Sequence, residues 1–361
     1  MMSLLLCLSV LDHGYAFQLP SFTYPIQVGQ SKHHLPATPA LSSPNNNVLS
    51  KSPSFTTTTR LESVPTEIWT CVLPPLFLGL YKSEYGVSYA YGTATALSAY
   101  LIAKSLSLAP TTLPYWHAAA LVFYGVRLNG FLAVRTAMSK RMQEMVQTIE
   151  DRAIARGNRL SRLPFIISCG LLYYGLVAPV VATSQLAAID YSTSTVVAKV
   201  FAGLVGLQWF GFAMAALGDF TKTHVKSNQK DDNFLVTSGI YSIVRHPNYT
   251  GEMIGWTANA ALGLMGAFLL RGKWSLTQLV ANVASNLVGW MGIIFVLLRA
   301  TSGLETRQVE KYGETTKYKE WVQSTWSGWT MASKKGPNAS TQEETPHLEV
   351  TDIDEDMGSG I

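Results

Sequence analysis

The chain has 361 residues, of which 48% are hydrophobic, 11% aromatic and only 14% charged. Soluble domains carry roughly 25% charged residues, so the composition excludes an ordinary soluble protein, and the aromatic content excludes a wholly disordered one. The net charge of +4 is a sum over unlike segments: residues 17–61 contain no acid, residues 61–333 carry 22 bases and 15 acids, and the last twenty residues contain seven acids. No basic run with interleaved aromatic residues is present, so no nucleic-acid partner is expected.

The N-terminal sixty residues predict a targeting segment. Residues 1–16 contain an apolar run too short to cross a bilayer and small residues before a cleavage point after Ala16, as in a signal peptide. Residues 17–61, rich in Ser, Thr and Pro, predict a disordered transit peptide. Together they resemble the bipartite presequences of algae with complex plastids, which implies a plastid membrane. The alternative is a signal anchor with a disordered tail, and then the endoplasmic reticulum membrane.

Residues 62–330 are the predicted membrane domain, and residues 331–361 a disordered acidic tail. Seven apolar stretches predict an all-α, polytopic transmembrane helix bundle, because about 20 residues cross the hydrocarbon as a helix that satisfies its own backbone hydrogen bonds. The first stretch is short and contains Pro74 and Pro75, which favour a kinked or interfacial helix. The stretches are residues 66–81, 87–110, 114–136, 163–183, 195–218, 250–270 and 276–299.

Basic residues and cysteines add two constraints. With seven crossings, three basic groups fall on one membrane face, which is expected to be cytosolic or stromal, and the N-terminus falls on the other. The three cysteines fit neither a disulfide framework nor a zinc site, so no metal is expected. The basic residues are Lys140, Arg141, Arg152, Arg156, Arg159 and Arg162, then Lys222, Lys226, Lys230 and Arg245, then Arg307, Lys311, Lys317 and Lys319.

The segment between the fifth and sixth stretches concentrates polar residues at membrane depth. Such residues are costly there and usually mark a ligand site. Lys222 and Arg245 suit phosphate or carboxylate, and Pro247 holds His246 in an extended conformation at the start of a helix. The sequence therefore predicts an anion-binding pocket. A basic loop that only sets topology and touches lipid headgroups explains the lysines, but not an Arg-His-Pro-Asn-Tyr string beside Glu252.

Two further groups belong to this prediction. Glu305, after the last stretch, is placed to accept ribose hydroxyls, and Arg307 to bind phosphate, although an amphipathic surface helix also explains them. In the third stretch, Arg135 is expected to extend to the basic face. Arg127 lies deeper and is expected to face the bundle interior, with either a structural or a ligand contact.

These groups resemble the steroid 5-alpha-reductase-like membrane proteins, in particular their large, poorly characterised polytopic branch. The string Arg-His-Pro-Asn-Tyr-x-Gly-Glu is the most specific part of the resemblance, which covers residues 66–325. Isoprenylcysteine carboxyl methyltransferases and sterol reductases are more distant relatives. The matching residues are Asp219, Lys222, Gly239, residues 245–249, Gly251, Glu252, Ser302, Gly303, Glu305, residues 311–313, Tyr318 and residues 124–128.

The resemblance implies an integral membrane oxidoreductase that reduces a carbon–carbon double bond of a steroid, isoprenoid or fatty lipid with NADPH. It does not identify the catalytic residues; Glu84 and Tyr85 are a guess for the Glu–Tyr pair of steroid reductases. A Tyr or a carboxylic acid would supply the proton. The implied cofactor-binding residues are Asp219, Lys222, Arg245, His246, Asn248, Tyr249, Glu252, Glu305, Tyr312 and Tyr318.

Two other functions remain open. Residues 235–249 also fit the Leu-Val-Thr-Ser-Gly-x-Tyr and Arg-His-Pro-x-Tyr string of isoprenylcysteine carboxyl methyltransferases, which use S-adenosylmethionine. Asn248, Glu252 and Ser302 favour the reductase branch instead. The third possibility is a non-catalytic lipid-binding relative that kept the pocket and lost the chemistry.

Overall fold

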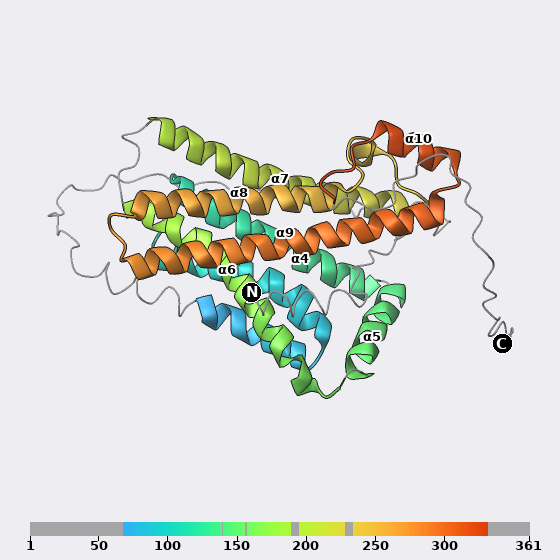
Figure 1. The fold of residues 1–361 in the computed structure, drawn as a ribbon, viewed down its shortest axis with the longest axis horizontal. Coiled ribbons are helices and arrows are strands. Elements are labelled where there is room, and N and C mark those ends of the chain that lie inside the picture. The colour runs from blue at the N-terminus through green and yellow to red at the C-terminus, as the bar shows by residue number, and fades with distance from the viewer. Residues whose placement is uncertain (1–67, 139, 156, 189–194, 228–233, 331–361) are drawn as a thin grey trace, which may run out of the picture. The chain divides into compact units, whose positions relative to one another are not determined.

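The computed structural model describes residues 68–330 except 139, 156, 189–194 and 228–233 (Figure 1). The predicted signal peptide, transit peptide and acidic tail lie outside these residues. The described part of the chain is all-α and forms a polytopic helix bundle, as the sequence predicts. It begins with a short apolar helix at Ile68–Leu80. The further elements are the π-helix η2 (Tyr85–Tyr89), α3 (Ala90–Ser105), α4 (Leu113–Met138), α5 (Lys140–Ala155), α6 (Leu163–Gln185), α7 (Thr195–Ser227), α8 (Pro247–Leu270), α9 (Leu276–Tyr312), α10 (Thr316–Ser324) and the short 3-10 helices η1 (Leu78–Leu80), η3 (Arg159–Arg162), η4 (Leu186–Ala188) and η5 (Gly239–Ser242).

Among the described residues, five helices are long and apolar enough to cross a membrane: α4, η3 with α6, α7, α8 and α9. The first two expected spans are shorter apolar helices, Ile68–Leu80 and α3. Two features differ from the expected pattern. The amphipathic helix α5 occupies the basic loop between α4 and α6, and α9 continues past residue 299 to Tyr312. Both carry polar residues that an apolar-run criterion does not detect.

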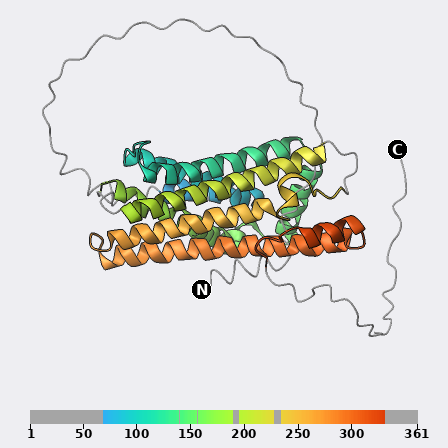
Figure 2. The same cartoon turned by 90° about the horizontal axis from the view of Figure 1, so that it is seen from above.

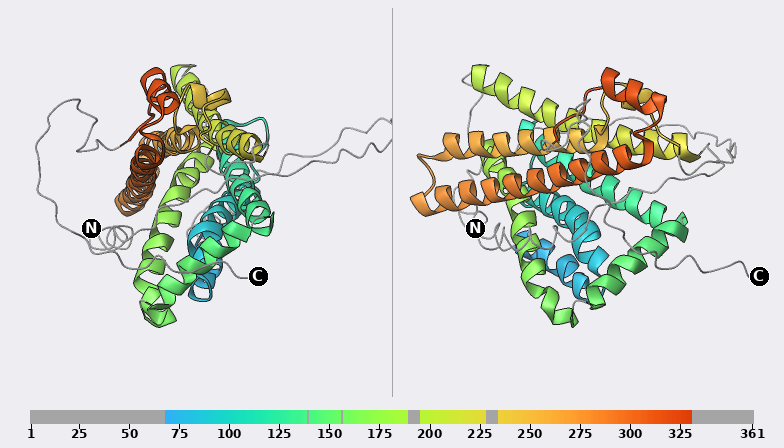
Figure 3. Two further views of the ribbon diagram at one scale, coloured as in Figure 1. Left: turned by 90° about the vertical axis from the view of Figure 1, so that its right-hand side faces the viewer. Right: turned by 45° about the vertical axis from the view of Figure 1, so that its right-hand side comes forward.

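The long helices pack so that α8 is covered by three neighbours, α6, α7 and α9. Viewed from above, α4, α7, α8 and α9 lie side by side in that order (Figure 2). Helices α3 and α6 pack against this row, and α5 connects the adjoining ends of α4 and α6 (Figure 3). Trp256, Tyr124 and Phe212 are fully buried where α4, α7 and α8 meet, and their rings contact one another.

Glycine sets the close approach of α7 and α8. A Cβ atom added at Gly211 would collide with the backbone of Gly255, and one added at Gly251 would lie 2.6 Å from the backbone nitrogen of Ala215. Without these side chains the two backbones come into direct contact, which is how small residues promote helix association in lipid. The contact places the first turns of α8 against the last turns of α7.

Replacing Gly211 by Ala is expected to lower the thermal unfolding midpoint of the detergent-solubilised protein by several degrees. The added methyl group must push α7 from α8, and overpacking of this kind costs about 1–3 kcal/mol. Gly203→Ala on the same helix is the matched control, because nothing lies within 4 Å of its added Cβ atom. That change should leave the midpoint equal or raise it through helix propensity. Equal midpoints for both variants would contradict the packing role of Gly211.

Charged residues from the ends of three long helices meet near the start of α8. Arg135 near the end of α4 and Asp219 near the end of α7 act on each other electrostatically, and both act on Tyr249 in the first turn of α8. Arg307 in the last turns of α9 also acts on Tyr249. Of these residues only Arg307 belongs to the predicted basic groups, so the shared membrane face of those groups stays a prediction.

Candidate functional site

The site is built on the loop that leads into α8. Gly239 has φ +62°, a left-handed conformation that favours glycine, and it begins the 3-10 helix η5. His246 is the residue before α8, with φ −130° and ψ 62°, and Pro247 occupies the first turn. The predicted extended conformation is not formed, because ψ of His246 is 62°. The proline keeps His246 out of the helical conformation and starts the helix without needing an N–H partner. Asn248, Tyr249 and Glu252 therefore project from the first turns of α8.

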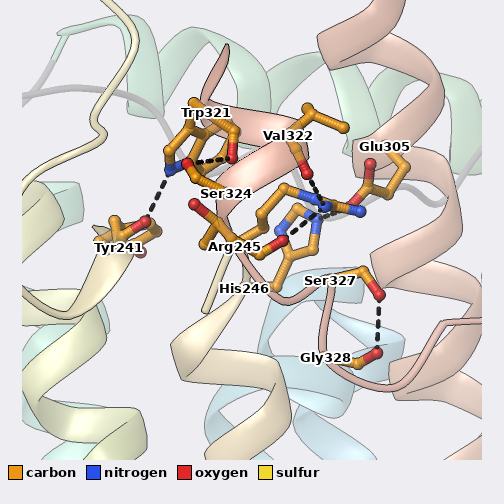
Figure 4. Close-up of polar contacts among 10 residues, drawn as sticks. Tyr241, Arg245, His246, Glu305, Trp321, Val322, Ser324, Ser327 and Gly328 are labelled. Atoms are coloured by element: carbon orange, nitrogen blue, oxygen red, sulfur yellow. Dashed lines mark hydrogen bonds and ion pairs between the residues drawn. The ribbon is translucent and has the colours of Figure 1, made fainter. Parts of the chain in front are cut away.

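Arg245, His246 and Glu305 form the first of two groups in the site (Figure 4). Arg245 Nε donates to Glu305 Oε1 at 2.9 Å, and His246 Nε2 lies 2.8 Å from the same oxygen. Burial lowers the pKa of His246 from its ordinary value, although the Glu305 carboxylate opposes the shift. His246 is therefore neutral at neutral pH, with Nε2 as the donor to Glu305. We refer to these three residues as the Arg245 clamp.

The Arg245 clamp also holds the segment after α10. Arg245 Nη1 donates to the carbonyl oxygens of Val322 and Thr325, at 3.2 and 2.9 Å. The backbone nitrogen of Arg245 donates to the Trp326 carbonyl, and that of Trp326 donates to the Ile243 carbonyl. This pairing forms the parallel bridge between Val244 and Trp326. The guanidinium expected to bind a cofactor phosphate thus has protein partners that join the α8 entry, α9 and the C-terminal segment.

The second group lies deeper, between α4, α7 and α8. Arg127 Nη1 pairs with Asp219 Oδ2 at 3.0 Å, and Asn248 Nδ2 donates to Asp219 Oδ1 at 3.2 Å. Tyr124 donates its hydroxyl proton to Glu252 Oε2 at 2.8 Å. We call these five residues the inner polar group. Arg127 faces the bundle interior, as predicted, and its contact within the chain is a buried ion pair.

Two tyrosines belong with the inner polar group. The Tyr91 hydroxyl lies 3.0 Å from that of Tyr124, so Tyr91 is placed to donate to Tyr124 while Tyr124 donates to Glu252. Tyr249 is buried and lies within electrostatic range of Asp219 and Glu252. The sequence names Glu252 and Tyr249, but nothing in it pairs Tyr91 with Tyr124. Tyr124 belongs to the matching residues 124–128, whereas Tyr91 has no signal beyond being a tyrosine inside an apolar helix, and most such tyrosines are core residues.

The structure places Arg135 differently from the prediction. The residue is 5% exposed and does not extend to the basic face. Its Nε, Nη1 and Nη2 atoms have no hydrogen-bond partner in the described part of the chain. Its guanidinium lies 5.4 Å from the ring centroid of Phe131, one turn earlier on α4. The helix ends in a crowded junction with α7 and α8, where the side chain is covered before it can reach water.

The other predicted residues lie around these groups. Lys222 is within electrostatic range of Asp219 and His246, so it lies between the Arg245 clamp and the inner polar group. Tyr318 packs against Trp321 and Tyr312, and burial raises its pKa above the ordinary value. Tyr312 and Tyr318 thus form an aromatic cluster beside the Arg245 clamp.

The guessed Glu–Tyr pair lies at the same end of the bundle. Glu84 is half-buried within electrostatic range of Arg135, and Tyr85 begins the π-helix and contacts the rings of Tyr81 and Tyr89. Burial raises the pKa of Glu84 above its ordinary value. Single π turns occur frequently at functional sites, and here the backbone carbonyls of Gly86 and Val87 accept from the Tyr173 hydroxyl.

A separate polar cluster deep in the bundle was not predicted. His117 is fully buried, with Nδ1 2.6 Å from Thr183 Oγ1 and Nε2 2.8 Å from Asn259 Oδ1. Asn259 also donates to the Leu176 carbonyl and accepts from Gln208. These contacts join α4, α6, α7 and α8 by satisfied hydrogen bonds, and they have the character of a structural network.

Replacing Asn259 by Leu is expected to lower the thermal unfolding midpoint by about 5 °C or more. The change leaves His117 and Gln208 buried without their common acceptor, and each unmet group costs about 1–3 kcal/mol. Asn282→Leu is the control, since its described hydrogen bond is a single donation to the Ala178 carbonyl. We expect a smaller shift for that variant in a thermal melt followed by tryptophan fluorescence. Equal decreases of the midpoint in both variants would show that the Asn259 oxygen, shared by His117 and Gln208, stabilises the protein no more than the single hydrogen bond of Asn282.

Across the described residues, no group of three or more His, Cys, Asp or Glu side chains could hold a metal ion. The polar chemistry of the site therefore consists of hydrogen-bond donors, paired carboxylates and buried cations. In the Arg245 clamp the cation is bound by the protein. In the inner polar group the Tyr124 hydroxyl donates to the Glu252 carboxylate, so a phenol and a carboxyl group lie within hydrogen-bond distance.

Comparisons with known proteins agree with this architecture. Residues 80–325 match the family described as Protein of unknown function (DUF1295). Over 107 residues the chain is 30% identical to the Protein-S-isoprenylcysteine O-methyltransferase of Dictyostelium discoideum. The match covers 29% of this chain and 37% of that protein, so the chain spans well under half of that relative. No solved structure matches.

Proposed function

The chain belongs to the DUF1295 family, an integral membrane family of steroid 5-alpha-reductase-like proteins, and from this premise we propose that it reduces a carbon–carbon double bond of a lipid with NADPH. The observation that carries the proposal is the pairing of Tyr124 with Glu252 in the inner polar group, among helices that a lipid can approach from the side. The described residues also supply cations at the adjoining end of the bundle, where a charged cofactor can enter from water.

The residues fit a phosphate-bearing cofactor. Arg127 Nε and Nη2, and Arg307 Nη2, are buried atoms with no hydrogen-bond partner in the described part of the chain. Guanidinium groups with free donors suit phosphate oxygens. Asn248 and Tyr249 are adjacent on the first turn of α8 and offer neutral hydrogen bonds. The residues proposed to hold NADPH are Asp219, Lys222, Asn248, Tyr249 and Glu252 directly, with Arg245, His246, Glu305, Tyr312 and Tyr318 around them.

NADPH, when bound, supplies the hydride that adds to one carbon of the double bond. The Tyr124 hydroxyl gives its proton to the neighbouring carbon, so two new C–H bonds replace the π bond. The Tyr124 oxygen would then regain a proton from Tyr91, whose hydroxyl lies 3.0 Å away, and Tyr91 would regain one from water, so that each turnover consumes one solvent proton. Glu252 orients Tyr124, and the Arg127–Asp219 pair keeps the surrounding charge balanced.

The Arg245 clamp has a positioning role in this proposal. By holding Glu305, Val322 and Thr325, Arg245 fixes the loop before α8 against α9 and the C-terminal segment. The first turn of α8, which carries Asn248 and Tyr249, is then held in place. Its contribution to cofactor binding is indirect, through the orientation of these residues.

A methyltransferase activity is the second candidate, because one partial match is to an isoprenylcysteine methyltransferase. S-adenosylmethionine carries a carboxylate that the same cations could bind. The reaction would transfer a methyl group to a carboxylate, and it would not need a proton donor such as Tyr124. The Tyr91–Tyr124–Glu252 contacts are what favour reduction.

A binding titration separates these functions. The purified, detergent-solubilised full chain is titrated with NADPH and with S-adenosylmethionine by calorimetry, and the NADPH sample is then supplied with unsaturated lipids. The reductase proposal expects NADPH to bind and to be oxidised when a suitable lipid is present. Binding of S-adenosylmethionine without NADPH would support the methyltransferase. Binding of neither would favour a non-catalytic lipid-binding protein.

A further inference from the structure

Arg135 is a buried cation that the proposed reaction does not use. It is 5% exposed, and its three guanidinium nitrogens lack hydrogen-bond partners in the described part of the chain. An arginine side chain remains charged in proteins, so it cannot reduce the cost of burial by losing its proton. An unpaired buried charge costs several kcal/mol. The position therefore requires compensation from another group.

The nearby carboxylates do not provide that compensation. Asp219 is within electrostatic range of Arg135, but its Oδ2 atom pairs with Arg127 and its Oδ1 atom accepts from Asn248. Glu84 is also in range and half-buried, but no hydrogen bond joins it to Arg135 in the described part of the chain. The Phe131 ring contributes a contact, but it donates no oxygen.

The surroundings also carry excess positive charge. Four cations, Arg127, Arg135, Lys222 and Arg307, act on Asp219, Tyr249 or both, against three carboxylates in the same surroundings, Asp219, Glu252 and Glu84. The Tyr249 hydroxyl lies within electrostatic range of Arg135 and could add a neutral donor. This end of the bundle, reached from the basic face, is suited to an anion that brings its own negative charge.

We propose that Arg135 binds an oxyanion of the ligand, a phosphate or a carboxylate, with Tyr249 and the free nitrogens of Arg127 as further donors. The proposal rests on the proposed function in one respect: the residue that binds the phosphate of NADPH is Arg135, whereas Arg245 only holds the loop before α8 in place. The same chemistry would accept the headgroup of an anionic phospholipid or the carboxylate of S-adenosylmethionine.

Arg135→Met tests the proposal in the full chain, because methionine removes the charge and keeps much of the volume. Dissociation constants are measured for NADPH, for S-adenosylmethionine, and for phosphatidic acid in phosphatidylcholine mixed micelles. Arg271→Met is the matched control, since Arg271 is exposed after α8 and contacts the Phe268 ring. The thermal midpoint of each ligand-free variant is recorded as well.

For the probe that carries the natural oxyanion, we expect Arg135→Met to weaken binding by about 10- to 100-fold, as for the loss of charged hydrogen bonds. Arg271→Met should change it less than twofold. The ligand-free Arg135→Met protein should be at least as heat-stable as the wild type, because an unpaired buried charge has been removed. A structural partner such as Glu84 would instead make that variant less stable.

Each alternative result decides between the two proposals. If phosphatidic acid or S-adenosylmethionine binds in an Arg135-dependent way and NADPH does not bind, the oxyanion site is supported and the reductase function is contradicted. If the wild type and Arg135→Met bind NADPH with equal affinity, NADPH remains the cofactor, but the proposal that Arg135 binds its phosphate is overturned. Failure of all three probes to bind the wild type, or a marked loss of stability in ligand-free Arg135→Met, also overturns it.

Discussion

Replacing Tyr124 by Phe should lower the rate of NADPH-dependent lipid reduction by about 100-fold or more, and should leave NADPH affinity unchanged. The change removes the hydroxyl that contacts Glu252 at 2.8 Å and Tyr91 at 3.0 Å, and with it the proposed proton donor. General acid catalysis contributes typically 10²–10⁴-fold. The ring remains in its contacts with Phe212 and Trp256, so the packing should survive.

The measurement is the decay of NADPH absorbance in single-turnover mixing with the lipid, beside calorimetric titration of NADPH. Tyr115→Phe is the matched control on the same helix, because the Tyr115 ring packs edge-to-face with Trp116 and belongs to neither polar group of the site. It should keep the wild-type rate within about twofold. A Tyr124→Phe enzyme with an unchanged rate would remove Tyr124 as the donor. A parallel loss of NADPH affinity would make it a binding residue.

Removing the Arg245 side chain, as in Arg245→Met, is expected to destabilise the ligand-free protein by about 3–5 kcal/mol. The variant removes the hydrogen bonds that Arg245 donates to the carbonyl oxygens of Val322 and Thr325. It also removes the hydrogen bond from Arg245 to the Glu305 carboxylate. The Arg245–Glu305 pair is only partly buried, so most of the loss comes from the hydrogen bonds, at about 1–3 kcal/mol for each acceptor left unmet. The expected readouts are a lower thermal midpoint and faster amide hydrogen exchange in residues 318–330.

Lys319→Met on α10 is the control, because Lys319 is exposed and lies 3.7 Å from an exposed Glu314. Surface pairs of that kind contribute little, so the midpoint should hardly move. If Arg245→Met kept the wild-type midpoint and exchange but lost NADPH affinity, Arg245 would be the phosphate-binding residue that the sequence resemblance implies. A loss of stability before any ligand is added supports the clamp.

Much of the fold was predictable because it depends on local chemistry. Apolar stretches of about 20 residues must form helices in lipid, and basic loops set which helix ends share a face. The start of α8 was equally local, since Pro247 keeps His246 out of the helix and occupies the first turn itself. The amphipathic helix α5 and the extension of α9 were missed because their polar faces interrupt the apolar pattern.

The sequence by itself determined the membrane bundle, the family, and most of the polar residues at its basic end. Only the tertiary structure decided which of them are partners. Arg245 binds Glu305 across 60 residues, and Tyr124 binds Glu252 across 128. Arg135, expected at the surface, is buried without a partner in the described chain. Periodicity fixes the face of one helix, but partners on different helices depend on how closely glycines such as Gly211 let those helices pack.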